Sequence, residues 1–152
     1  MRPLYLSALV IFVTDQLSKY IVVQWMGLRF LGEIDVLPPF INFRMAWNTG
    51  INFGILNVSR WLLIAIALGI CIWVYRWVRK ENARPVALVS AGLLIGGALG
   101  NVVDRITYGA VADFLNISCC GIENPYAFNI ADISIFAGAF GLILFTGQKK
   151  TP

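Results

Sequence analysis

Long runs of apolar residues, separated by short polar segments, dominate this chain. Four runs approach the roughly 20 residues that an α-helix needs to cross a membrane core of about 30 Å. They cover residues 4–26, 61–78, 86–103 and 130–147, and each of the last three has 18 residues. We therefore predict an α-helical membrane protein with four transmembrane helices.

A different pattern occupies the segment between the first two runs. In INFRMAWN (residues 41–48), apolar residues alternate with mostly polar ones, which is typical of a β-strand with one apolar face. Such a strand next to a membrane is expected on its surface, as a small extracytoplasmic β-platform. If VADFLNI (111–117) is also extended, Asp113 lies on the same face as Val111, Leu115 and Ile117.

The composition agrees with a membrane location. Hydrophobic residues make up 59% of the 152 residues and charged residues 13%, too few to cover a water-soluble surface. We interpret residues 1–152 as a single integral membrane domain. The first run is long, is interrupted by Asp15 and Lys19, and is followed by no small-x-small cleavage site, so we expect it to remain in the mature protein.

The positive charges predict an orientation. Lysines and arginines are more frequent near the cytoplasmic ends of membrane helices. Here one side carries Arg2, Arg76, Arg79, Arg84, Lys80, Lys149 and Lys150, and the other carries Arg29, Arg44, Arg60 and Arg105. Both termini are therefore expected in the cytoplasm, with segments 27–60 and 104–129 outside. Basic residues that flank apolar runs form no patch for a nucleic acid.

Metal chemistry has little support in the sequence. The chain has no histidine and three cysteines, so the usual zinc sites are not expected, and we predict neither a metal nor a cofactor. Cys71 lies within an apolar run, where a small apolar residue suffices. Cys119 and Cys120 are neighbours in an outer segment, and their role is open.

Small residues recur every fourth position within the runs. This spacing allows helix backbones to approach closely and predicts a compact bundle. The positions are Gly92, Gly96 and Gly100, then Ala65 and Gly69, and Ala137 and Gly141.

Charges inside the apolar runs are costly and invite functional hypotheses. Asp15 and Lys19 share a helix face, which also fits a structural ion pair with Lys19 reaching toward the outer headgroups. Asp104 and Arg105 follow the third run and would fit a helix cap and a charge pair at the membrane boundary.

Asp132 has two readings as well. It fits a capping box in which Asn129 is the N-cap of the last helix. Asp113 and Asp132 are also both expected on the outer side, beside apolar surface. Two close carboxylates share one proton, as an aspartic peptidase requires to activate water. The spacing alone does not establish that they meet.

In its motifs the chain resembles the lipoprotein signal peptidases, also called signal peptidase II. The resemblance extends over the whole chain and rests on the order and spacing of five motifs. They are DQLSK (15–19), NTGINFGIL (48–56), GGALGNVVDR (96–105), GAVADFL (109–115) and FNIADISI (128–135).

The resemblance implies an aspartic endopeptidase of the bacterial inner membrane, with its active site near the periplasmic face. Such enzymes cleave the signal peptide from diacylglyceryl-modified prolipoproteins, just before the lipidated cysteine, and are inhibited by globomycin-type peptides. It implies catalysis by Asp113 and Asp132. It implies substrate contacts from Asn48, Asn101, Arg105 and Asn129, and supporting positions at Asp15, Lys19, Gly50, Gly54 and Asp104. Its partners would be the substrate and membrane lipid, and we expect a monomer.

Two departures and two alternatives accompany this interpretation. Ile51 and Asn52 replace two alanines that are frequent in the family's N-x-G box, and SCCGIEN (118–124) is not a pattern typical of the family. The first alternative is a small proton-coupled transporter or channel subunit that uses the intramembrane carboxylates as a relay. The second is an assembly factor whose acids only cap helices, in which Asn would be tolerated at positions 113 and 132.

Overall fold

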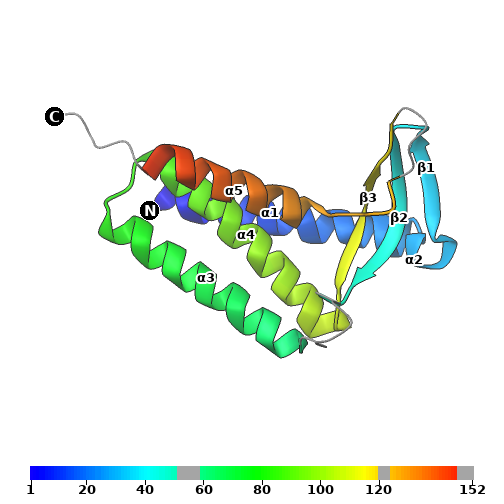
Figure 1. Ribbon diagram of the computed structural model, residues 1–152, viewed down its shortest axis with the longest axis horizontal. Helices are drawn as coiled ribbons and strands as arrows, with labels where there is room; N and C mark the ends of the chain where they lie inside the picture. Colours follow the sequence, from blue (N-terminus) through cyan, green and yellow to red (C-terminus); the bar gives the residue numbers. More distant parts are fainter. Residues whose placement is uncertain (51–58, 120–123, 147–152) are drawn as a thin grey trace.

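The computed structural model describes residues 1–50, 59–119 and 124–146. Its helices lie side by side, and a small sheet stands across one end of them (Figure 1). The long helices are α1 (Arg2–Lys19), α3 (Arg60–Lys80), α4 (Pro85–Tyr108) and α5 (Ile130–Thr146). A π-helical segment η1 (Tyr20–Trp25) extends α1, and a short helix α2 (Leu28–Leu31) follows it.

The central helix of the bundle is α4. It packs against α1, α5 and α3, and most of its apolar window is buried, whereas the windows of the first span and of α3 are mostly exposed. The outer faces of the surrounding helices are apolar as well, with Trp73 63%, Phe136 77% and Ile143 75% exposed. Helices that are apolar all round suit a lipid environment.

Three helical stretches are long and apolar enough to cross a membrane: Arg2–Trp25, Arg60–Lys80 and Pro85–Tyr108. The fourth predicted span is present as the apolar helix α5, but its 17 described residues make it shorter. The membrane helices predicted in these regions are therefore confirmed for three of the four.

The third span is longer than predicted. We expected it to end at residue 103, yet α4 continues to Tyr108. The helix ends where Gly109 adopts the left-handed conformation (φ 80°), which glycine reaches without steric cost. No residue between 103 and 108 stops a helix in this way. Asp104 and Arg105 consequently belong to α4 instead of following it.

Glycines set the close approach of α4 to its neighbours. A Cβ at Gly92 or Gly96 would collide with α1, near Leu4 and Ala8, which confirms the packing predicted from that stripe. The same prediction is wrong for Gly69 of α3, where a Cβ would meet no described atom within 4 Å.

The sheet has three antiparallel strands in the order β1 (Glu33–Leu37), β2 (Ile41–Asn48) and β3 (Val111–Ile117). The strands predicted at 41–48 and 111–117 are both confirmed, and β1 is an additional strand. β2 pairs with β3 with an irregularity between Phe43 and Ala46, after which Ala46 lies opposite Asp113.

The two faces of β3 have different neighbours. Ala112 and Phe114 pack with Val22, Val23 and Leu28 in a core beneath the sheet. Asp113 projects from the opposite face of the strand and is only 3% exposed, because the start of α5 lies on that side. This small core holds β3 against the bundle.

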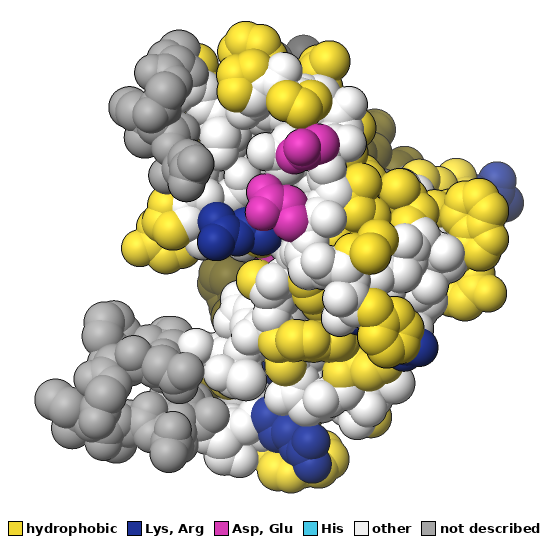
Figure 2. Space-filling view, turned by 90° about the vertical axis from the view of Figure 1, so that its right-hand side faces the viewer, with side chains coloured by type: hydrophobic (Ala, Val, Ile, Leu, Met, Phe, Trp, Pro, Cys, Tyr) yellow, Lys and Arg dark blue, Asp and Glu magenta, His cyan; other side chains and the backbone are white. Residues whose placement is uncertain are grey.

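The sheet end carries exposed apolar side chains beside charged ones. Figure 2 looks onto this end and shows hydrophobic side chains gathered along one side, next to acidic and basic groups. Around α2, Trp25 and Phe30 are each 77% exposed, and Leu31 is 66% exposed. Exposed clusters of this kind are characteristic of surfaces that contact a membrane or a partner.

Candidate active site

The chain path brings the two predicted acids together. Asp113 is the third residue of β3, and Asp132 lies in the first turn of α5. Between them, Phe128 pairs with Leu115 through backbone hydrogen bonds in both directions, at 2.8 and 2.9 Å. This short bridge returns the chain to β3, so that α5 begins directly beside Asp113.

Asn129 joins the two carboxylates. Its side chain is fully buried, and Nδ2 donates a hydrogen bond of 2.5 Å to Oδ1 of Asp113. Its Oδ1 accepts from the backbone N–H of Asp132 at 2.9 Å, and its own N–H donates to Oδ2 of Asp132 at 3.3 Å. The last two bonds form the predicted capping box. One residue thus caps α5 and links both acids.

Asn101 of α4 supports Asp132 from the other side. Its Nδ2 donates to Oδ1 of Asp132 at 2.9 Å. Its Oδ1 accepts from Asn129 and from Lys19, each at 3.3 Å. The described partners therefore engage both ends of the Asn101 amide, which fixes the side chain that orients Asp132.

Asn48 contacts Asp113 from the end of β2. Its Nδ2 donates to Oδ2 of Asp113 at 3.1 Å, and its Oδ1 accepts from the N–H of Gly50 at 3.0 Å. Gly50 has φ 110°, a conformation that side chains rarely allow, which explains a glycine here. The predicted supporting residue Gly54, like Ile51 and Asn52, lies outside the described residues.

A buried charge cluster lies beside the acids, between α1 and α4. Lys19 Nζ contacts Asp15 Oδ2 at 2.8 Å, as the spacing of these residues predicts, and also Asp104 Oδ2 at 2.7 Å. The expectation that Lys19 reaches the outer headgroups is wrong, because the residue is only 6% exposed and points into the bundle. Two carboxylates hold the ammonium there more strongly than one would.

The expected boundary pair of Asp104 and Arg105 is also wrong. Asp104 is buried and faces Lys19, and its Oδ2 accepts from the N–H of Ala112 at 3.2 Å. No ion pair joins Arg105 to Asp104 in the described part of the chain, and Nη1 of Arg105 donates to the backbone oxygen of Asn101 at 3.4 Å. Arg105 Nε is buried and has no hydrogen-bond partner among the described residues.

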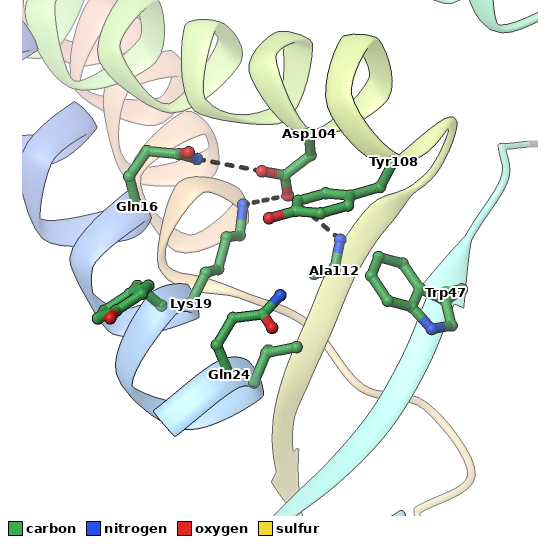
Figure 3. Close-up of a pocket in the computed structure, with 9 residues that line it drawn as sticks. Gln16, Lys19, Gln24, Trp47, Asp104, Tyr108 and Ala112 are labelled. Atoms are coloured by element: carbon green, nitrogen blue, oxygen red, sulfur yellow. Dashed lines mark hydrogen bonds and ion pairs between the residues drawn. The ribbon is translucent and has the colours of Figure 1, made fainter. Parts of the chain in front are cut away.

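A pocket of about 180 Å³ opens beside the charge cluster, between the end of α1, η1, the end of α4 and the strands β2 and β3. Figure 3 shows Lys19 and Gln16 pointing toward Asp104, with Tyr108 drawn beside Asp104 and Trp47 farther along the wall of the pocket. The rings of Trp47 and Tyr108 lie 5.5 Å apart. Members of the charge cluster and both rings of the aromatic pair therefore line the same pocket.

Electrostatics distinguish Asp113 from an ordinary surface acid. Burial, followed by the nearby charge of Asp132, raises the pKa of Asp113 from 3.8 to about 6. The hydrogen bonds from Asn48 and Asn129 and the charge of Lys19 oppose this rise. The negative charge of Asp132 makes ionisation of Asp113 less favourable, as expected for two neighbouring carboxylates.

One contributor to the site was missed in the sequence. Gln16 lies within the DQLSK motif, but only the charged residues at the two ends of that motif, Asp15 and Lys19, were predicted to support the site. Its Nε2 donates to Asp15 and to Asp104, each at 3.1 Å. A polar residue beside an intramembrane aspartate was the available signal.

These features define a class: an α-helical membrane protein with two carboxylates that are linked through one buried asparagine at the sheet end of its bundle. The comparisons with known proteins then identify the family. The family model for signal peptidase (SPase) II matches residues 7–147. The chain belongs to the signal peptidase II family.

Curated relatives and solved structures agree with this assignment. A lipoprotein signal peptidase of Shewanella amazonensis is 42% identical over 146 residues, which is 92% of this chain and 84% of that protein. One of Methylorubrum extorquens is 44% identical over 112 residues, which is 71% of this chain and 64% of that protein. A solved structure described as a bacterial membrane enzyme has a TM-score of 0.83 at 31% identity, covering 99% of this chain and 96% of that one.

Proposed function

We propose that this protein is a membrane aspartic endopeptidase that removes signal peptides from diacylglyceryl-modified prolipoproteins, cleaving just before the lipidated cysteine. The substrate class comes from the family and from the names of the relatives. The observation that carries the mechanism is the link between Asp113 and Asp132 through Asn129. A carboxylate pair is sufficient to hydrolyse an amide when one member is ionised and the other is protonated.

We assign the shared proton to Asp113. It is the more buried acid, and its pKa is already raised to about 6. Asp132 accepts hydrogen bonds from Asn101 and Asn129 and lies in the first turn of α5, where the helix dipole favours a negative charge. A bound substrate would exclude more water and favour the protonated form of Asp113 further.

The reaction then proceeds in two steps. Asp132 takes a proton from a water molecule while the water oxygen attacks the amide carbon, and Asp113 gives its proton to the carbonyl oxygen. The resulting tetrahedral diol collapses when a proton passes from Asp132 to the amide nitrogen and the C–N bond breaks. Asp113 recovers its proton from the diol, which leaves a new carboxyl group on the signal peptide and a free amine on the cysteine.

The surrounding polar residues divide into two groups. Arg105, whose Nε has no partner in the described part of the chain, and the exposed Asn48 are placed to bond the peptide backbone of the substrate. Asn101 and Asn129 are fully engaged with the acids, so their first role in our proposal is to orient them. Globomycin-type inhibitors would compete for the same residues.

The arrangement of charges supports a topology. The first residues of α1 and the α3–α4 connection, which carry Arg2, Arg79, Lys80 and Arg84, lie at the end of the bundle opposite the sheet (Figure 1). We propose that this end faces the cytoplasm, that α5 is the fourth span, and that the carboxylate pair lies near the periplasmic face of the inner membrane. The exposed apolar side chains around α2 would then lie in the outer leaflet, where the diacylglyceryl chains of the substrate remain.

The test is hydrolysis of a diacylglyceryl-modified prolipoprotein by the purified protein in detergent. Asp113→Asn and Asp132→Asn should each abolish turnover while the protein stays folded. Asp35→Asn is the matched control, because Asp35 is an exposed acid on β1 at the same end of the molecule. Absence of cleavage by the wild type would overturn the function, and activity retained in either site variant would remove that acid from the mechanism.

A further inference from the structure

The ammonium of Lys19 has three protons to donate and contacts three partners among the residues that the structure describes. It contacts Oδ2 of Asp15 at 2.8 Å, Oδ2 of Asp104 at 2.7 Å and Oδ1 of Asn101 at 3.3 Å. All four side chains are at least nine-tenths buried. The donors of Lys19 are therefore committed within the bundle, and the adjoining pocket receives none of them.

Each of the two carboxylates of this cluster also accepts a hydrogen bond from a backbone N–H group. Asp15 Oδ1 accepts a hydrogen bond of 2.9 Å from the N–H of Ala131, and Asp104 Oδ2 accepts one of 3.2 Å from the N–H of Ala112. Ala131 immediately precedes Asp132, and Ala112 immediately precedes Asp113. The cluster thus holds the backbone next to each acid, although α5 and β3 belong to different parts of the fold.

We propose that Lys19, through Asp15 and Asp104, is a positioning residue that sets the separation of Asp113 and Asp132. The inference rests on the proposed peptidase function and adds an element outside the reacting groups. Lys19 draws both carboxylates toward one point, and each carboxylate draws one backbone segment with it. Asn101 couples the same ammonium to the side chain of Asp132, so the backbone and side-chain positions are fixed together.

A purely structural ion cluster is the alternative. Buried ion pairs contribute little net stability because desolvation offsets the attraction, so stability alone does not account for three buried charges here. A positioning role and a structural role differ in what they change. Misplacing reacting groups by about 1 Å can reduce turnover about 100-fold. A loss of folded protein lowers the total rate without changing the properties of the molecules that remain folded.

Gly100→Ala perturbs the cluster without changing any charge. A Cβ at Gly100 would lie 2.6 Å from Oδ2 of Asp15, so this carboxylate must move, while alanine itself favours the helix. Gly69→Ala is the matched control, since a Cβ at that helical glycine meets open space. Asp104→Asn is a second, nearly isosteric perturbation, and it removes the attraction to Lys19.

The assay is cleavage of the diacylglyceryl prolipoprotein across pH, with rates normalised to the folded fraction from size-exclusion chromatography. Two carboxylates that share a proton give a bell-shaped profile whose width reflects their coupling. Both variants should lower kcat about tenfold, leave KM within about twofold, and narrow the bell, because the acids move apart. A charge effect alone would move both limbs of the Asp104→Asn profile together and leave the width unchanged. The charged groups that act on Asp113 are Asp132, Lys19 and Arg105, and Asp104 acts on Arg105.

The outcomes separate the two hypotheses. If wild type and Gly69→Ala cleave the substrate but Gly100→Ala keeps the wild-type kcat and the wild-type width, the positioning role is wrong and the peptidase function stands. A bell that widens also contradicts the positioning role. If the wild type does not cleave, the proposed function fails first. Should Asp104→Asn not fold, Gly100→Ala decides the question alone.

Discussion

Replacing Asn129 separates its structural role from its electrostatic one. Asn129→Ala removes both the N-cap of α5, at 2.9 Å, and the 2.5 Å hydrogen bond to Asp113. Asn129→Ser keeps a side-chain oxygen that can cap the helix but cannot reach Asp113 with a donor in the same way. The pair of variants therefore isolates the cap.

The expected magnitudes follow from the two bonds. Losing an N-cap costs about 1 kcal/mol. Above about pH 6, where Asp113 of the free protein is ionised, losing a hydrogen bond to this charged group costs about 2 kcal/mol. Asn129→Ala should thus lower the free energy of unfolding by about 3 kcal/mol, and Asn129→Ser by about 2 kcal/mol. Both variants lose a bond that favours ionised Asp113, so both should raise its pKa above the wild-type value of about 6.

Unfolding by SDS in mixed micelles measures the first effect, and the alkaline limb of the pH dependence of kcat/KM measures the second. The alkaline limb should move to higher pH equally in both variants, while the serine variant is the more stable by about 1 kcal/mol. Equal stability of the two variants would refute the capping argument. An unmoved or acid-shifted limb would refute the assignment of the shared proton to Asp113.

Three further predictions concern stability. Because the pKa of Asp113 rises from 3.8 to about 6 on folding, the folded protein binds more protons between these values, so the free energy of unfolding should fall as pH rises from about 4 to 6. Asp113→Asn should flatten this dependence in pH-dependent SDS titrations, and an unchanged slope would contradict it. Gly96→Val should disrupt α1–α4 packing and lower the melting temperature by several degrees, whereas Gly69→Val of α3 should cost less; equal losses would refute the close approach. Ser59→Ala should destabilise α3 by about 1 kcal/mol, as Ser59 Oγ accepts from the N–H of Trp61, and no loss in the same titration would exclude that cap.

Local patterns predicted much of the fold. Alternation in residues 41–48 was sufficient for β2, and the spacing of three positions from Asn129 to Asp132 was sufficient for the capping box. Both signals depend only on neighbours in the sequence. The strand β1 was missed because it is short: the polar and apolar residues of Glu33–Leu37 alternate over only four positions before Leu37 and two prolines. In the structure this segment pairs with β2.

The surroundings of Lys19 required knowledge of the tertiary structure. Helical spacing placed Asp15 and Lys19 on one face of α1, but it could not say that Asp104 of α4 faces them. When a lysine near a helix end has only one acidic partner, its ammonium is expected to extend toward the lipid headgroups. A second buried carboxylate makes the interior of the bundle the more favourable position for that ammonium. The end of α4 was predicted too early for a related reason. A charged residue at position 104 indicates the end of a membrane span unless its buried partner, Lys19, is known.

The central claim is that the carboxylate pair activates water directly, and a single turnover in ¹⁸O-labelled water tests it. Excess wild-type enzyme is mixed with the diacylglyceryl prolipoprotein in H₂¹⁸O, and the released signal peptide and the enzyme are examined by mass spectrometry. Direct attack predicts one ¹⁸O atom in the new carboxyl group and none in Asp113 or Asp132. An unlabelled peptide, with ¹⁸O appearing in either aspartate, would show covalent attack by that carboxylate and contradict the account.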